Sequence, residues 1–334
     1  MSVIVNVSGA PLELLEIPQL LAIHSLRNQI DPWVLNTFFP NRASFAATEV
    51  PVASLKTYSP IAPLVAPSLK GRPIDGKGQA DVKFIKPAYL KPSGTVTPDN
   101  VYDTALLNQL RNAGVIGLGG QMLSAGDAML VAQIEKFTLN RQSIDNRKIL
   151  MAIECLLTGK LILRSDDFPE YIVDYGRDPS CTFAPATLWS AGGATVVSDI
   201  EAMMKITVDK SGVSPRMALT TSKVYTAMFN NAEFKARFVT PLAGISAPVT
   251  PQFNRTDMPQ YRGMFDGLEV WTYDAGYMDQ ATETFVRYIP ETYFGLVSDM
   301  DGTLSHCGIL HLDAFKQPLE YFDYMDESKN PSAI

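Results

Sequence analysis

The chain has 334 residues, 46% hydrophobic and 19% charged, so it is long enough for one large domain or two of ordinary size with a sizeable core. Its formal net charge of −7 argues against a strongly basic surface for nucleic acid. Its three cysteines have neither paired nor metal-type spacing, which fits a reducing compartment. No basic leader precedes an apolar core, and no stretch reaches the roughly 18 apolar residues of a membrane span, so we expect folding in a cytoplasm.

Residues 1–49 are predicted to form an arm rather than a domain. Leu12–Leu26 favours a short helix, and a second helix starts at Asp31-Pro32-Trp33. Pro40 ends it, because proline disfavours helix in the preceding residue. Three aromatic side chains need burial that so short a segment cannot supply. We expect them to dock on the rest of the subunit or on a neighbour: Trp33, Phe38 and Phe39.

Residues 50–98 are predicted to form an extended ribbon. They hold eight of the 23 prolines, a spacing that permits edge strands but forbids helix. Val50–Tyr58 reads as the outgoing strand, Lys70–Gly78 as a turn-rich tip and Ala80–Phe84 as the returning strand. A two-stranded ribbon alone is only marginally stable in water, so we expect it to lie on another subunit. A surface loop folded back on its own domain is the alternative.

The ribbon is basic, whereas the whole chain is acidic. Residues 50–98 carry seven lysines and arginines against two aspartates. We therefore expect the ribbon to lie across an acidic face of an adjacent subunit. The ribbon residues expected at this contact are Lys56, Lys70, Arg72, Asp75, Lys77, Lys83 and Lys86. The nearest acidic partners are Glu135, Asp145, Glu154, Asp166, Asp167 and Glu170.

One long helix is predicted from Ala125 to Thr158. The segment contains no proline, Ser124 can cap its start, and Gly159 can end it in the left-handed conformation. Apolar residues recur at helical spacing along it. At about 1.5 Å per residue the helix would be roughly 50 Å long, a beam for other elements. A long core helix or a coiled coil is the alternative, although no strict heptad is sustained.

A compact region of mixed strands and helices is predicted to follow. Ser198-Asp199-Ile200-Glu201 has the pattern of a capping box that opens a helix to about Val208. Antiparallel strand pairs without regular βαβ order predict an α+β fold. The other expected elements are strands at Lys160–Leu163, Tyr171–Tyr175, Arg216–Leu219, Leu268–Tyr273, Phe285–Ile289, Tyr293–Val297 and Thr303–Leu310, and a helix at Ser222–Phe229.

One motif suggests catalysis. Asp299, Asp301, Gly302 and Thr303 match the D-x-D-G-T loop of haloacid-dehalogenase-type phosphatases, where one aspartate attacks phosphorus beside Mg²⁺. Only 31 residues follow Thr303, too few for the rest of such a domain. Asp-x-Asp-Gly is also an ordinary hairpin turn in which Gly302 takes positive φ, and we favour that interpretation. No catalytic, cofactor or metal site is expected.

Several short segments, in one order over nearly the whole chain, carry a family resemblance. Together they resemble signatures of the lambda-type major capsid proteins (phage capsid protein E family) of tailed bacteriophages. The segments are Phe84–Pro92 (FIKPAYLKP), Met151–Leu163 (MAIECLLTGKLIL), Val173–Asp178 (VDYGRD), Leu188–Ser190 (LWS) with Asp199–Ala202 (DIEA), and Tyr261–Gly263 (YRG) with Leu268–Trp271 (LEVW).

The resemblance implies the Hong-Kong-97-like capsid fold. Its parts would be an N-terminal arm (1–49), an extended E-loop (50–98), a peripheral or P domain with a spine helix at about 125–158 (99–195), an axial or A domain (196–312) and a segment returning to the P domain (313–334). Family members usually continue to a further terminal strand, for which Tyr321–Met325 is the candidate here.

The implied function is self-assembly into an icosahedral shell around double-stranded DNA. The implied partners are further copies of the chain in hexamers and pentamers, a portal, a cement or decoration protein, and DNA held by non-specific contact. About 50 residues precede the ribbon, too few for a fused scaffold, so we expect a separate scaffolding protein. Assembly would occur in the host bacterial cytoplasm and the product would be the virion. The alternatives are the phosphatase, a tail-tube protein or a scaffold protein.

Overall fold

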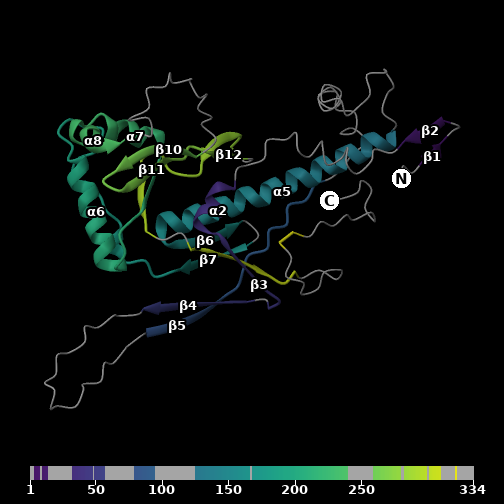
Figure 1. Ribbon diagram of the computed structural model, residues 1–334. Coiled ribbons are helices and arrows are strands. Elements are labelled where there is room, and N and C mark those ends of the chain that lie inside the picture. Colours follow the sequence, from purple (N-terminus) through teal and green to yellow (C-terminus); the bar gives the residue numbers. More distant parts are fainter. Residues whose placement is uncertain are drawn as a thin grey trace, which may run out of the picture.

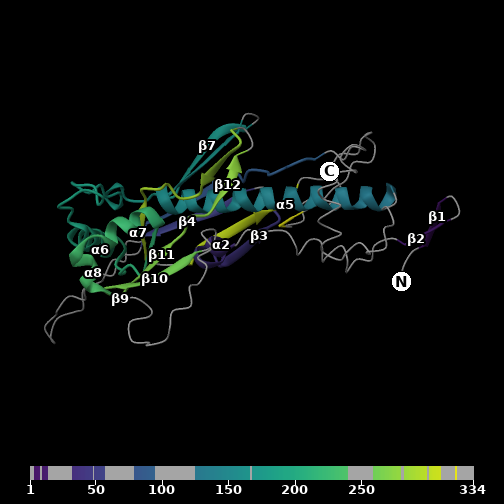
Figure 2. The same cartoon turned by 90° about the horizontal axis from the view of Figure 1, so that it is seen from above.

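The computed structural model describes residues 4–7, 10–13, 32–47, 49–56, 79–94, 125–165, 168–239, 259–279, 282–298, 301–309 and 320–321. Helix α5 (Ala125–Thr158) is the longest element in Figures 1 and 2, and it has the predicted bounds. Gly159 ends it with φ +69°, and the Gly159 N–H donates to Cys155 O at 2.8 Å. The predicted glycine cap is therefore confirmed.

A five-stranded sheet lies beside the C-terminal end of α5 (Figure 1). Strands β8 and β11 are parallel and the other neighbouring pairs are antiparallel. In spatial order the strands are β14 (Phe294–Val297), β8 (Met217–Thr220), β11 (Leu268–Thr272), β10 (Gln260–Phe265) and β9 (Phe238–Val239). The helices beside it are α6 (Val196–Ser211), α7 (Ser222–Phe229) and α8 (Ala232–Arg237). The result is a mixed α/β arrangement.

Strand β8 is buried on both faces of the sheet, because its side chains alternate between two cores. Met217 and Leu219 of β8 pack with Ile149 and Ile153 of α5 in one of them, which we call the helix core. Ala218, between them, faces the other, which we call the lobe core. The lobe core consists of Val196, Val197, Ile200, Ala218, Met228, Phe234, Phe238, Phe265, Leu268 and Val270. A single sheet thus joins the long helix to the three shorter ones.

Helix α6 begins earlier than the sequence predicted. Its N-cap is Thr195, and the predicted capping box at Ser198–Glu201 is wrong. Val196 and Val197 are fully buried in the lobe core, so packing rather than side-chain capping sets the start of the helix. The Asp199 carboxylate instead accepts hydrogen bonds from Trp189 Nε1 at 2.8 Å and Thr195 Oγ1 at 3.3 Å.

The remaining strands form two-stranded sheets. Strands β3 and β15 pair in parallel and the others are antiparallel. The pairs are β1 (Ile4–Val7) with β2 (Ala10–Glu13), β3 (Asn41–Phe45) with β15 (Thr303–Cys307), β4 (Val50–Lys56) with β5 (Gln79–Ile85), β6 (Lys160–Ser165) with β7 (Phe168–Asp174), and β12 (Gly276–Asp279) with β13 (Thr284–Arg287).

Two short helices complete the described elements. They are α2 (Trp33–Phe38) and the 3-10 helix η1 (Pro179–Cys181). Residues 12 and 13 lie in β2 rather than in the predicted helix Leu12–Leu26, whose remainder is outside the described residues. Within the described part of the chain, no helix is both long and apolar enough to cross a membrane.

Candidate functional site

The β4–β5 ribbon is a separate two-stranded sheet. The two strands pair from Val50 with Ile85 to Lys56 with Gln79, and neither pairs with another described strand. Figure 1 shows the ribbon pointing away from the sheet and from α5. Phe84 on β5 is 65% exposed, and Tyr89 beyond it is also exposed. Exposed aromatic residues on an unpaired ribbon are typical of a surface that another molecule covers.

The described part of the ribbon includes few of the predicted contact residues. The Lys86 ammonium lies 3.6 Å from Glu49 Oε1 at the base of the ribbon, so this lysine has a partner within its own subunit. The side chains of Lys56 and Lys83 lie outside the described residues. The same holds for the whole predicted tip, Lys70, Arg72, Asp75 and Lys77.

The predicted acidic partners do not gather into one described cluster. Asp145 is engaged within the subunit, because it lies 3.8 Å from Lys148 and accepts a hydrogen bond from Tyr321. Glu154 is half-buried near the end of α5, and burial raises its pKa. Glu170 is exposed on β7. The side chain of Glu135, and Asp166 and Asp167, lie outside the described residues.

The three arm aromatics lie against the subunit itself. The Trp33 ring is stacked on Tyr273 at 5.8 Å between centroids and lies 5.4 Å from Trp271. Phe38 is 2% exposed in the helix core, and Phe39 packs against that core from outside. Helix α2 therefore contributes its apolar side chains to the same core as α5.

The D-x-D-G-T segment is hydrogen-bonded to the N-terminal arm. Gly302 N–H donates to Phe38 O at 3.0 Å, and Asn41 Nδ2 donates to Asp301 O at 3.2 Å. Strand β14 before it pairs with β8, whereas β15 after it pairs with β3. The predicted hairpin is therefore wrong, because the two strands belong to different sheets. Asp299 lies outside the described residues.

Gly302 is required for close approach rather than for positive φ. It is absent from the described residues with positive φ, and a Cβ at this position would lie 2.3 Å from Phe38 O and 2.5 Å from the Phe39 ring. The segment thus has a packing role. Among the described residues, no group of three or more histidine, cysteine, aspartate or glutamate side chains could hold a metal ion.

Gly302→Ala should destabilise the subunit by about 1–3 kcal/mol, because the new methyl group must displace the backbone of Phe38. Gly192→Ala is the matched control, since a Cβ there meets nothing within 4 Å. Urea unfolding followed by circular dichroism measures the free energy of unfolding of both variants. Equal stabilities of the two variants would contradict the close-approach role.

A cluster of side chains that we call the clasp joins the described end of the chain to the C-terminal half of α5. Lys148 Nζ lies 2.9 Å from Glu320 Oε1 and 3.9 Å from the centre of the Tyr321 ring, and the Tyr321 hydroxyl donates to Asp145. His306 Nε2 of β15 is buried, has no hydrogen-bond partner among the described residues, and lies 4.0 Å from Glu320 Oε1. No sequence pattern predicted this clasp, because its members are 172 residues apart and are not periodic.

The clasp should weaken in acid. Burial lowers the pKa of His306 below its ordinary 6.5, assisted by Lys148 and Arg42 and opposed by Glu320. Burial raises the pKa of Glu320, but the hydrogen bond from Lys148 and the nearby positive charges outweigh it, so the pKa lies below 4.5. Both shifts favour folding at neutral pH. Stability should fall as the pH drops below about 6.5 through His306, and again below about 4.5 through Glu320.

Urea midpoints between pH 7.5 and pH 4 measure this dependence. His306→Gln removes the titrating group, so its midpoint should fall less than that of the unmodified protein between pH 6.5 and 5. Identical pH profiles for the two proteins would contradict a role of His306.

The sequence matches the model of one protein family. The family model for phage major capsid protein E matches residues 17–334. A solved protein described as a prophage capsid protein, from E. coli CFT073, is 16% identical, with a TM-score of 0.61 over 100% of this chain and 92% of its own. At that identity the similarity shows the fold alone.

A phage-related protein from Bordetella bronchiseptica RB50 is 11% identical over 87% of this chain and 98% of its own. Its TM-score of 0.28 is too low to support an argument. No curated protein matches the sequence.

Proposed function

The chain belongs to the phage major capsid protein E family, and we propose that its copies assemble into the icosahedral shell around the double-stranded DNA of a tailed bacteriophage. Its role is that of a structural capsid protein of the virion and not of an enzyme. The phosphatase alternative at Asp299 and Asp301 has no support from the family or from the capsid-like fold.

The observation that carries the proposal is the β4–β5 ribbon. It pairs with no other described strand and exposes Phe84, as expected of an element completed by another copy. We assign it the role of an E-loop that lies on the α5 and β6–β7 region of a neighbour. The basic tip and the exposed Glu170 support the expected charge complementarity.

A Hong-Kong-97-like plan of domains belongs to the same proposal. Helix α5 would be the spine of a P domain (99–195), and the sheet with α6, α7 and α8 would form the A domain (196–312). The contacts of Glu320 and Tyr321 with α5 support a C-terminal segment (313–334) that returns to the P domain.

The proposed partners follow from the capsid role. Copies would form hexamers and pentamers, with a portal at one vertex, a cement protein outside, and DNA held by non-specific contact. A separate scaffolding protein would direct assembly in the host cytoplasm. The net negative charge of the chain supports non-specific contact with DNA, since no net positive charge is available to bind phosphate tightly.

Electron microscopy of the purified full chain, with and without the scaffolding protein expressed beside it, tests the proposal. We expect uniform closed shells with the scaffold, and irregular or no shells without it. Uniform shells from the chain alone would contradict the scaffold. Tubes would instead indicate a tail-tube protein, and small particles with Mg²⁺-dependent phosphatase activity would indicate the enzyme.

A further inference from the structure

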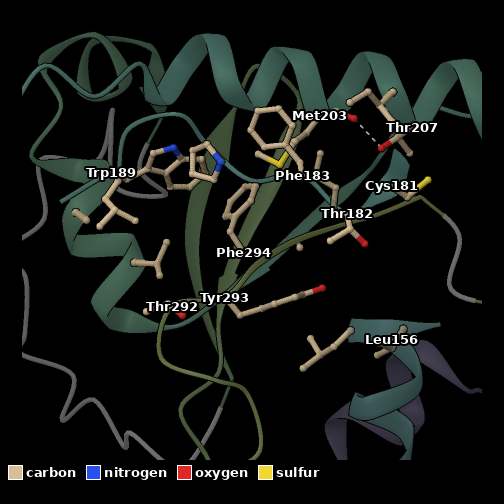
Figure 3. Close-up of a pocket in the computed structure, with 18 of the residues that line it drawn as sticks. Leu156, Cys181, Thr182, Phe183, Trp189, Met203, Thr207, Thr292, Tyr293 and Phe294 are labelled. Atoms are coloured by element: carbon tan, nitrogen blue, oxygen red, sulfur yellow. Dashed lines mark hydrogen bonds between the residues drawn. The ribbon is translucent and has the colours of Figure 1, made fainter. Parts of the chain in front are cut away.

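A pocket of about 570 Å³ lies between the end of α5 and the lobe of α6 and α7 (Figure 3). The volume is in the range of small-molecule sites. Most of its wall is apolar and aromatic. Phe183, Trp189, Phe294 and Met203 gather on one side, and the Tyr293 ring extends toward Leu156 on the other (Figure 3).

The pocket joins the two cores of the subunit. Leu156 and Tyr293 pack against the helix core. Trp189, Met203 and Phe294 pack against the lobe core. A molecule held between these walls would contact both cores at once.

Two polar side chains at the pocket pack closely against glycines. A Cβ at Gly159 would lie 2.5 Å from the Arg177 Cβ, and a Cβ at Gly295 would lie 2.6 Å from the Tyr293 hydroxyl. Each glycine therefore leaves the space that its polar neighbour occupies. Burial raises the pKa of Tyr293, although the charge of Arg177 opposes the rise, so the phenol is a neutral hydrogen-bond donor at pH 7.

Arg177 retains donors and charge for a ligand. Its guanidinium donates to Leu157 O, to Cys181 O at 3.4 Å and to Thr182 Oγ1 at 2.8 Å, which leaves some of its five N–H groups unused. Its acidic neighbours in sequence are paired with other residues, Asp174 with a lysine at 3.1 Å and Asp178 with another at 2.9 Å. Within the described part of the chain, no carboxylate forms an ion pair with Arg177.

The other charges of the wall balance each other. Lys223 Nζ lies 2.7 Å from Glu291 Oε2, so this pair adds no net charge to the pocket. Arg177 therefore gives the pocket a net positive charge beside aromatic walls. The wall is complementary to a molecule with a flat apolar body and one anionic group.

We propose that this pocket binds a small aromatic or branched apolar anion, such as a carboxylate or sulfonate. The anion lies at Arg177 and the Tyr293 hydroxyl, and the apolar body lies between Phe183, Phe294 and Leu156. A bound molecule links the end of α5 to the lobe and raises the stability of the subunit.

The test uses two fluorescent probes that differ by one group, with the unassembled full-length subunit. 8-Anilinonaphthalene-1-sulfonate carries an anion, and N-phenyl-1-naphthylamine has the same rings without it. We expect the sulfonate to bind one site with Kd of order 10–100 µM. The neutral probe should bind at least fivefold more weakly, because it cannot use the charge of Arg177.

Variants locate the binding site. Ala227→Trp, which fills the pocket, should abolish binding of both probes, whereas Ala236→Trp, at an exposed position outside the lining residues, should leave binding unchanged. Arg177→Gln should remove the preference for the sulfonate. If the loss of the Leu157 contact unfolds that variant, Tyr293→Phe should weaken the sulfonate about threefold and the neutral probe little.

Three results would overturn the proposal. They are no saturable sulfonate binding by the folded subunit, equal affinity for the two probes, and unchanged binding to Ala227→Trp. None of these measurements depends on shell formation, so failure of the pocket proposal is distinguishable from failure of the capsid role.

Discussion

Reversing Lys70, Arg72 and Lys77 to glutamate together should leave a soluble, folded subunit that assembles at least tenfold more slowly. The change turns the basic tip of the ribbon acidic, so it repels the acidic neighbour that it is proposed to contact. Exposed ion pairs contribute only about 0–1 kcal/mol each to stability. Charge steering, however, changes association rates by about 10–10³-fold at low salt. Light scattering with scaffolding protein present measures the rate.

Salt and a compensating variant test the cause. At about 1 M salt the Debye length falls to roughly 3 Å, so the unmodified protein should also assemble slowly. Adding Asp166→Lys, Asp167→Lys and Glu170→Lys to the reversed ribbon should recover part of the rate, because the attraction is restored with opposite signs. Normal shells at the normal rate from the reversed ribbon alone would show that these charges do not guide assembly.

Phe38→Ala should cost about 3–5 kcal/mol of unfolding free energy. Phe38 of α2 is 2% exposed in the helix core, and its removal leaves a cavity in the core that α2 shares with Ile149 and Ile153 of α5. Because Phe38 O also accepts the Gly302 N–H, we expect the β3–β15 pair to loosen with α2. Thermal unfolding and hydrogen exchange measure the two effects.

Phe84→Ala is the matched control, since Phe84 is 65% exposed on β5. Its effect on subunit stability should stay within about 0.5 kcal/mol. A cost for Phe38→Ala as small as that expected for Phe84→Ala would mean that Phe38 is not a core residue of the isolated subunit, and that its burial depends on a neighbour.

Elements with strong local signals could be predicted from the sequence. Helix α5 has its predicted bounds because one proline-free apolar pattern ends at a glycine, and α7 likewise spans the predicted residues 222–229. The D-x-D-G-T segment could not be interpreted this way, because the role of Gly302 depends on the backbone of Phe38, far away in the chain.

The candidate site, too, could be predicted only in part from the sequence. Composition alone indicated an exposed basic ribbon, and β4 and β5 occupy the predicted strands. The clasp of Lys148 and Tyr321 and the pocket beside Arg177 could not be predicted, since each depends on residues that only the tertiary fold brings together. Neither has a spacing that a search along the sequence could recognise.

The parallel pairing of β3 with β15 has a consequence for biosynthesis. Asn41 and Asp301 are 260 residues apart, so the early strand must wait for its partner while the ribosome makes the rest of the chain. At about 5–20 residues per second that delay is of the order of 13–50 s. A nascent chain released at residue 298 should leave the β3 amides open to hydrogen exchange, and protected amides there would disprove the delay. Since β4 follows β3 directly, we expect the ribbon to be held in its final direction only when translation is nearly complete. Subunits would therefore not polymerise through the ribbon while they are still being synthesised.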